Sequence, residues 1–139
     1  MDKSIFKFKK FTVDQSGCAM KINTDGVLLA ALAEAKTQVH MLDIGTGTGV
    51  IALMLAQRFP AAYIEGIEID ADASITAALN FKNSDFNERL ISKNVAIADY
   101  QSLKKFDLII SNPPYFVNDL KNTELKKRDS SPCGRAIFY

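Results

Sequence analysis

The order of apolar segments along residues 38–111 is the feature that most constrains the fold of this chain. Four short β-rich runs, "QVHMLDIG", "AYIEGIEID", "KNVAIAD" and "FDLIIS", are interleaved with two helical runs, "TGVIALMLAQRF" and "ADASITAALNFKNSDF". Strands that alternate with helices pack as a parallel sheet with right-handed crossovers. The near-continuous apolar run of the last strand is typical of a sheet covered on both faces. The sequence therefore predicts an α/β, doubly wound Rossmann-like sheet.

The segments on either side of this core differ from it in pattern. The opening "SIFKFKKFTV" alternates apolar and polar residues, which predicts a short strand or hairpin. The run "TDGVLLAALAEA" predicts a helix with Thr24 or Asp25 as its N-cap. After the last strand the chain becomes polar, with at most one short helix near residues 118–127. We therefore expect three parts: 1–35, which closes the pocket of the core; 36–116, the core; and 117–139, an irregular tail.

Composition excludes several classes of protein. The net charge of +1 gives no bulk signal for nucleic acid or membrane binding, and the longest apolar runs are far short of a membrane span. The N-terminus lacks the apolar centre of a signal peptide, so we expect a cytoplasmic protein. Two cysteines, Cys18 and Cys133, do not make a disulfide framework. With His40 as the single histidine, and without CxxC or HxxxH spacing, we expect no metal.

The run "LDIGTGTG" joins the first core strand to a helix, the context in which a glycine-rich turn indicates a ligand. Gly45 and Gly47 allow a sharp turn and close approach of a ligand, and Gly49 is expected to let the helix pack against the strand. The spacing is G-x-G-x-G, and Asp43 at the strand end would repel a pyrophosphate. A ligand with an ammonium group and no phosphate, such as S-adenosylmethionine, suits the turn better than a dinucleotide. The less favoured interpretation is a turn whose glycines serve geometry alone.

Two further acids follow at strand ends. Glu68 closes the second strand about twenty residues after the glycines, where a dinucleotide-type site places the carboxylate that holds ribose hydroxyls. Asp70 and Asp72 are expected to cap the following helix. Asp99 ends the predicted third strand in "IADY", where a short acid could accept a hydrogen bond from an adenine amino group. A turn or helix cap explains Asp99 equally well.

The run "SNPPYF" follows the fourth strand, which should lie beside the first, where ligands bind in such sheets. Pro113 and Pro114 lack backbone N–H groups, so their carbonyls are fixed in direction. The Asn112 side-chain oxygen and the Pro113 carbonyl could accept both hydrogens of a planar amino group, with Tyr115 as a ring to stack on. An amine held in this way can attack a methyl group without a strong base. A rigid turn is the alternative, but the neighbouring glycine turn favours a site.

These motifs have a family resemblance. In their order, "LDIGTGTG", "IEID" and "NPPY" resemble the class I S-adenosylmethionine-dependent methyltransferases that act on an amino nitrogen. The stretch "FTVDQSGCAMKINTDGVLLAAL" is similar to the N-terminal signature of the bacterial tRNA(Val) adenine-N6 methyltransferases, which methylate an adenosine beside the anticodon. The resemblance covers residues from about Phe6 to Phe116. It implies S-adenosyl-L-methionine as cofactor and tRNA as substrate.

The resemblance also implies roles for single residues. The cofactor would contact residues at the glycine turn, at the strand ends and in the first helix: Thr24, Asp25, Asp43, Gly45, Gly47, Gly49, Glu68 and Asp99. The target adenine, flipped out of its loop, would be oriented by Asn112, Pro113, Pro114 and Tyr115. Lys3, Lys7, Lys9 and Lys10 could meet RNA phosphates, although a solvated edge strand explains any one of them better.

The end of the sequence departs from the family pattern. Members continue with three more strands, whereas here "KKRDSSPCGRAIFY" follows "NDLK". We therefore expect the C-terminal strands to be missing or incomplete, which would leave the fourth strand with an open edge available for pairing. Three alternatives stay open: a protein-glutamine N5 methyltransferase of release factors, a truncated non-catalytic cofactor-binding module, and an NAD-dependent oxidoreductase. The N-terminal signature disfavours the first, and Asp43 with the G-x-G-x-G spacing disfavours the last.

Overall fold

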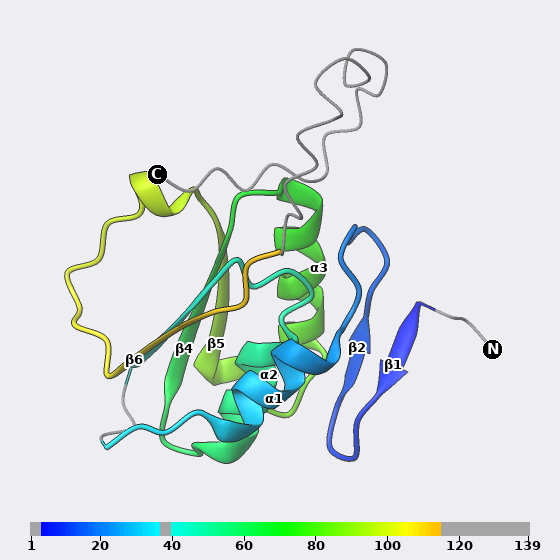
Figure 1. Ribbon diagram of the computed structural model, residues 1–139, viewed down its shortest axis with the longest axis horizontal. Helices are drawn as coiled ribbons and strands as arrows, with labels where there is room; N and C mark the ends of the chain where they lie inside the picture. Colours follow the sequence, from blue (N-terminus) through cyan, green and yellow to red (C-terminus); the bar gives the residue numbers. More distant parts are fainter. Residues whose placement is uncertain (1–3, 37–39, 115–139) are drawn as a thin grey trace, which may run out of the picture.

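The computed structural model describes residues 4–36 and 40–114, which form two sheets and three α-helices (Figure 1). The strands are β1 (Ile5–Lys7), β2 (Thr12–Asp14), β3 (His40–Ile44), β4 (Tyr63–Glu68), β5 (Leu90–Asn94) and β6 (Leu108–Ser111). The helices are α1 (Thr24–Leu32), α2 (Val50–Arg58) and α3 (Ala71–Lys82), with short 3-10 helices at Asn87–Arg89 and Ile97–Asp99. The predicted tail 117–139 and the helix near 118–127 lie outside the described residues.

The larger sheet is parallel, as predicted, with the order β5-β4-β3-β6. The strand predicted to lie beside the first core strand does so, because β6 pairs with β3. Asp43 stands opposite Gly66 of β4 on one side and Ile110 of β6 on the other. This register brings the carboxyl ends of three neighbouring strands to one edge of the sheet, where parallel α/β sheets bind ligands.

One face of the sheet forms the core with α2 and α3. Met41, Ile64, Leu90 and Leu108 occupy one register row, and all belong to the hydrophobic cluster or pack against it. Six of the nine residues of α2 are buried, which explains why its sequence is apolar on almost every side. The helix ends before Pro60, and the Arg89 guanidinium donates hydrogen bonds to three carbonyls around this end: those of Ala56, Phe59 and Ala62.

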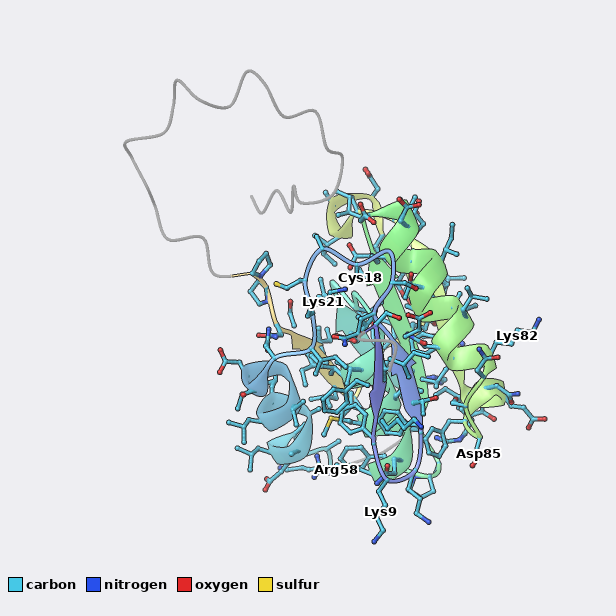
Figure 2. The ribbon with its side chains drawn as sticks, turned by 90° about the vertical axis from the view of Figure 1, so that its right-hand side faces the viewer. Lys9, Cys18, Lys21, Arg58, Lys82 and Asp85 are labelled. Carbon is cyan, nitrogen blue, oxygen red and sulfur yellow. The ribbon has the colours of Figure 1, made fainter. Side chains whose placement is uncertain are left out.

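The predicted N-terminal hairpin is present as β1 and β2, and α3 holds it in place. Figure 2 shows Lys9 at its turn, with Cys18 and Lys21 at the opposite end. The buried Asn80 side chain accepts a hydrogen bond from Asp14 N (2.9 Å) and donates to Asp14 O and Thr48 O (both 2.8 Å). Because Thr48 belongs to the glycine turn, this single amide ties the hairpin to the turn.

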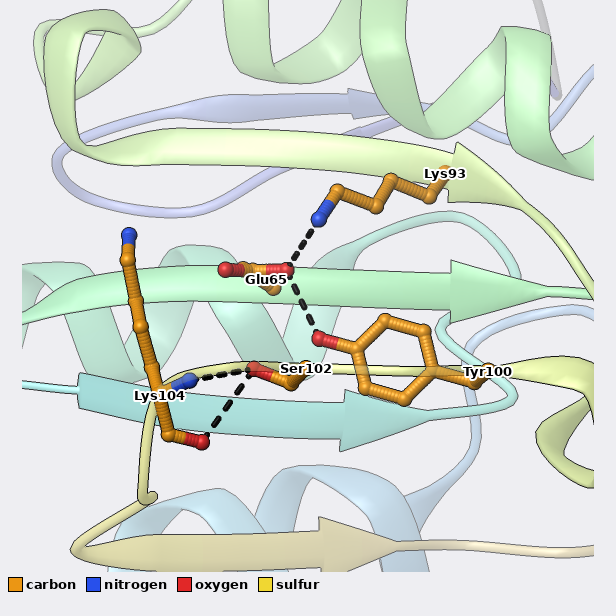
Figure 3. Close-up of polar contacts among 5 residues, drawn as sticks. All are labelled: Glu65, Lys93, Tyr100, Ser102 and Lys104. Carbon is orange, nitrogen blue, oxygen red and sulfur yellow. Dashed lines mark hydrogen bonds and ion pairs between the residues drawn. The ribbon is translucent and has the colours of Figure 1, made fainter.

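The other face of the sheet is covered near its centre by the connection between β5 and β6. The Tyr100 hydroxyl donates to Glu65 Oε2 at 2.8 Å, and Lys93 forms an ion pair with the same carboxylate (Figure 3). Burial would raise the pKa of Glu65, but the hydrogen bonds from Lys93 and Tyr100 outweigh it and hold that pKa below its usual value. Around this cluster, Ile91 and Ile109 stay half exposed.

Two predicted boundaries are wrong. The N-cap of α1 is Asn23, one residue before the predicted Thr24 or Asp25, because the Asn23 side chain accepts from Gly26 N at 2.8 Å. The third core strand runs over Leu90–Asn94 instead of "KNVAIAD", so Asp99 lies in a 3-10 helix. Pairing with β4 decides this, since Leu90 stands opposite Ile64 and the ladder finishes at Asn94. Asp70 does cap α3, by accepting from Ala73 N.

Candidate active site

The glycine turn after β3 folds over the end of β4. Its three glycines all have left-handed backbone: φ is 71° at Gly45, 54° at Gly47 and 82° at Gly49. The N–H groups of Gly45 and Thr46 both donate to the Ile67 carbonyl, at 2.9 and 3.0 Å. The Gly47 N–H donates to Glu68 Oε2 at 2.9 Å. The turn therefore depends on glycine conformations and is anchored to the neighbouring strand.

The glycines serve different purposes. A Cβ on Gly45 would meet no atom within 4 Å, so this glycine borders open space. A Cβ on Gly49 would lie 2.5 Å from the Phe81 ring, so Gly49 makes room for α3, and its expected role in packing the helix against the strand stays a prediction. The glycine in contact between strand and turn is Gly66, whose Cβ would come within 2.7 Å of the Thr46 side chain. A glycine inside a strand, as in "IEGIE", often marks a place where another segment approaches closely, so the sequence did carry a signal for the contact between Gly66 and Thr46.

Asp43 is fully buried beneath the turn. Its Oδ2 accepts a hydrogen bond from Thr46 Oγ1 at 2.7 Å, and its Oδ1 has no partner among the described residues. Burial raises the pKa of Asp43 to about 7, and the nearby charge of Glu68 adds to the rise, while the Thr46 hydrogen bond opposes it. A buried carboxylate oxygen without a donor, next to a glycine turn with open space, fits a ligand that brings a cation or hydrogen-bond donor.

Glu68 joins the glycine turn to the start of α3. Its two oxygens accept from Gly47 N and from Asp70 N at 2.9 and 3.0 Å. Each carboxylate oxygen can accept a further hydrogen bond, so the predicted contact with ribose hydroxyls is compatible with this arrangement. Asp99 is exposed beyond β5, five residues after the end of that strand. Its predicted contact with an adenine stays a prediction.

Residues 112–114, called the NPP turn from here on, follow β6 at the same edge of the sheet as the glycine turn. Ser111 stands opposite Ile44, and its Oγ donates to the Ile44 carbonyl at 3.0 Å. Asn112, the first residue after β6, is therefore level with Gly45, the first residue after β3. The Asn112 amide donates from Nδ2 to Asn23 Oδ1 at 3.4 Å, which brings the N-terminal helix to this turn. Thr24 and Asp25 are exposed in the first turn of that helix.

The structure therefore brings together most of the predicted site residues: Asp43, the three glycines, Glu68, Asn112, and the start of α1 with Thr24 and Asp25. Pro113 and Pro114 follow Asn112, and Tyr115 lies outside the described residues. Sequence reasoning missed Asn23, although an asparagine directly before a helix is a common N-cap signal.

Within residues 4–36 and 40–114, no three His, Cys, Asp or Glu side chains gather as potential metal ligands. The helices found in the same ranges are all too short or too polar to cross a membrane. Lys7, Lys9 and Lys10 are exposed, and Figure 2 places Lys9 at the end of the hairpin remote from Cys18 and Lys21. Lys3 falls outside the described residues.

Because the Asp43 carboxyl is buried, we expect the free energy of unfolding to fall as the pH rises. Its pKa is about 7 in the folded chain against 3.8 for an ordinary aspartate, so the carboxyl is protonated in both the folded and the unfolded chain below pH 3.8, and its contribution to stability is greatest there. Between these values only the unfolded chain is ionised, and the free energy of unfolding should fall by about 1.4 kcal/mol per pH unit until it levels off above pH 7.

Urea unfolding at a series of pH values from 4 to 8 measures this contribution when Asp43→Asn is compared with the parent chain. The asparagine can still accept from Thr46, and it does not titrate. The difference in unfolding free energy between the two proteins should change steadily up to about pH 7 and then level off, since all other titrating groups are shared. Parallel profiles for the two proteins would show that Asp43 is ionised in the folded chain.

Comparison with known proteins gives the site a context. Residues 18–128 match the family described as MTS: Methyltransferase small domain. A curated protein of Pedobacter heparinus, named tRNA1(Val) (adenine(37)-N6)-methyltransferase, is 59% identical over 90% of this chain and 53% of its own length. A Porphyromonas gingivalis protein of the same name is 50% identical over 86% of this chain and 51% of its own length. The chain spans about half the length of the curated relatives it matches.

Solved structures show the same fold at low sequence identity. YjhP from E. coli has a TM-score of 0.57 and 17% identity, covering 70% of this chain and 41% of that chain. A SAM-dependent methyltransferase from Geobacter sulfurreducens, solved with S-adenosyl-L-homocysteine, has a TM-score of 0.56 and 18% identity, covering 67% of this chain and 39% of that chain. Both structures share the α/β fold of this chain.

Proposed function

The chain belongs to the methyltransferase small domain family, and from this premise we propose that it binds S-adenosyl-L-methionine for methylation of the N6 amino group of an adenosine in tRNA(Val). The resemblance inferred from the sequence motifs is confirmed at the level of the family. The observation that carries the proposal is the pairing of β6 with β3, which sets Asn112 beside Gly45. A methyl donor at the glycine turn and an amine at the NPP turn would then be neighbours.

The residues at the glycine turn fit this cofactor. The open space beside Gly45 leaves room for it, and the unpartnered Asp43 oxygen offers an acceptor for its ammonium group, directly or through water. Glu68 has lone pairs left for ribose hydroxyls at the end of β4. When bound, S-adenosylmethionine supplies an electrophilic methyl group on a sulfonium. The residues of this chain hold and orient the cofactor, and they do not have to activate the methyl group.

The NPP turn would act on the other reactant. Asn112 Oδ1 and the Pro113 carbonyl would accept the two hydrogens of the adenine amino group and direct its nitrogen toward the methyl. These acceptors also stabilise the positive charge that develops on the nitrogen during attack. The nitrogen bonds to the methyl carbon as the sulfur–carbon bond breaks, with S-adenosylhomocysteine as the leaving group. The nitrogen then loses its proton to water, so a strong general base is unnecessary. Proximity and alignment supply most of the rate enhancement, and the adenosine must leave its base stack to reach the turn.

Transfer of a labelled methyl group tests the proposal. The chain is incubated with labelled S-adenosylmethionine and either a tRNA(Val) transcript or a bacterial release factor, and cofactor binding is measured separately by calorimetry. We expect binding of S-adenosylmethionine but not NAD, and label in N6-methyladenosine of the tRNA. Label in a glutamine of the release factor would favour the first alternative. Cofactor binding without transfer to either would favour a non-catalytic module, and absence of cofactor binding would contradict the proposal as a whole.

We propose tRNA as the partner and the cytoplasm as the place of action on the strength of this substrate. Lys7, Lys9 and Lys10 are exposed and free to meet phosphates. Because Lys9 lies at the remote end of the hairpin (Figure 2), contacts there would involve the RNA away from the methylated nucleotide. Their contribution would be electrostatic and would weaken with salt.

A further inference from the structure

The N-terminal helix contributes a positioning device to the NPP turn. We infer that Asn23 and Gly26 fix the orientation of the Asn112 side-chain amide so that its oxygen, not its nitrogen, is presented to the substrate. This inference rests on the proposed function for its catalytic consequence, while the contact itself can be tested without any activity. Asn23 and Asn112 are 89 positions apart in the sequence, so only the fold brings them together.

The hydrogen bonds around Asn23 determine which way the Asn112 amide faces. Asn23 Oδ1 accepts from Gly26 N at 2.8 Å as the cap of α1, so this oxygen is held in place by the helix. The Asn112 group that faces it, at 3.4 Å, is the Nδ2 donor. A flipped Asn112 amide would set two acceptor oxygens against each other, which is unfavourable. The capping oxygen of α1 therefore selects one of the two amide orientations.

The selected orientation is the one that the chemistry needs. With Nδ2 turned toward Asn23, Asn112 Oδ1 accepts no hydrogen bond from residues 4–36 and 40–114, so it can accept a hydrogen from an amino group. The opposite orientation would offer an N–H group to an amine whose own hydrogens also need acceptors. The distance of 3.4 Å is long for a hydrogen bond, so the contact is weak, but it favours the orientation that turns a donor toward the capping oxygen.

Gly26 controls how closely α1 approaches. It is buried in the first turn of the helix, and it is absent from the glycines with positive φ, so backbone conformation does not require a glycine there. A Cβ at this position would lie 3.0 Å from Asn112 Nδ2, 3.4 Å from Asn23 Oδ1 and 3.7 Å from Ile51 Cδ1. A methyl group at this position would therefore press on the Asn112 amide, which would have to move by a few tenths of an ångström.

Three variants and one matched control test the inference. Asn23→Ala removes both the cap and the contact, whereas Asn23→Asp keeps an acceptor for both. Gly26→Ala keeps the cap and crowds Asn112, and alanine is intrinsically the better helix former. Ala31→Gly is the control, because Ala31 is exposed on the same helix and the change weakens α1 without approaching Asn112.

The first measurement is the pair of Asn112 side-chain amide resonances in a 1H–15N spectrum, assigned by their loss in Asn112→Asp. We expect them to shift in Asn23→Ala and Gly26→Ala and to stay in place in Ala31→Gly. The second is methyl-transfer kinetics: kcat should fall roughly tenfold to a hundredfold in Asn23→Ala and Gly26→Ala, with the affinity for S-adenosylmethionine changed by far less than kcat, and Asn23→Asp should restore kcat.

The outcomes separate the inference from the proposed function. If the Asn112 amide resonances shift as expected in the variants while the parent chain transfers no methyl group, the contact is supported and the proposed activity is contradicted. Resonances that stay unchanged in both Asn23→Ala and Gly26→Ala would overturn the inference. An equal loss of kcat in Ala31→Gly would overturn it as well, because the stability of α1 would then be sufficient to explain the effect.

Discussion

Replacing Asn112 with alanine should lower kcat for methyl transfer by roughly two to three orders of magnitude, while the affinity for S-adenosylmethionine stays within a few fold. The size of the loss follows from removing one preorganised hydrogen-bonding group at the reacting centre. Asn112 lies directly after β6, and most of the proposed cofactor contacts come from other elements: Asp43 on β3, the glycine turn, the end of β4 and the first turn of α1. The change therefore removes the acceptor for the target amine and leaves the cofactor side of the site in place.

Single-turnover transfer to tRNA(Val), together with calorimetry of cofactor binding, measures the two effects separately. Asn87→Ala is the matched control, since Asn87 is an exposed asparagine in the 3-10 helix before β5 and has no part in the proposed site. Its activity should equal that of the parent chain. An Asn112→Ala protein that still transfers methyl groups at the parent rate would remove Asn112 from the mechanism and leave the NPP turn as a structural turn.

Local signals in the sequence were sufficient for the order of the elements and for the edge at which the site forms. A parallel sheet has one carboxyl edge, so motifs that follow successive strands must meet there once the strand order is known. This is why Asp43, Glu68 and Asn112 could be grouped from sequence alone. The pairing of β6 with β3 confirms the strand order on which that grouping depended.

Contacts that depend on packing between distant segments could not be predicted. The role predicted for Gly49 concerned the neighbouring strand, and the close approach of the Phe81 ring on α3 was not anticipated. The capping role of Asn23 has a local signal, but its contact with Asn112 exists only in the folded chain. The third strand was misplaced because "NVAIAD" is as β-like in composition as "LISKN", and only pairing with β4 distinguishes them.

Alanine at Gly49 should act mainly on stability and alanine at Gly45 mainly on ligand binding, although both glycines have left-handed backbone. Gly49→Ala should lower the free energy of unfolding by about 3 kcal/mol or more, because backbone strain adds to overpacking against Phe81, whose ring lies 2.5 Å from the added Cβ. That is a large part of the roughly 5–15 kcal/mol that stabilises a typical domain. Thermal unfolding should shift down by roughly 10 °C.

Gly45→Ala carries only the backbone strain of about 1–2 kcal/mol, because its Cβ meets no atom within 4 Å. The chain should therefore fold, but the methyl group enters the space proposed for the cofactor, and affinity for S-adenosylmethionine should fall by roughly tenfold or more. Thermal unfolding and calorimetry on the two variants give the pattern directly. If Gly45→Ala binds the cofactor as tightly as the parent chain, the ligand does not lie against this turn, since the same methyl group cannot share that space with it.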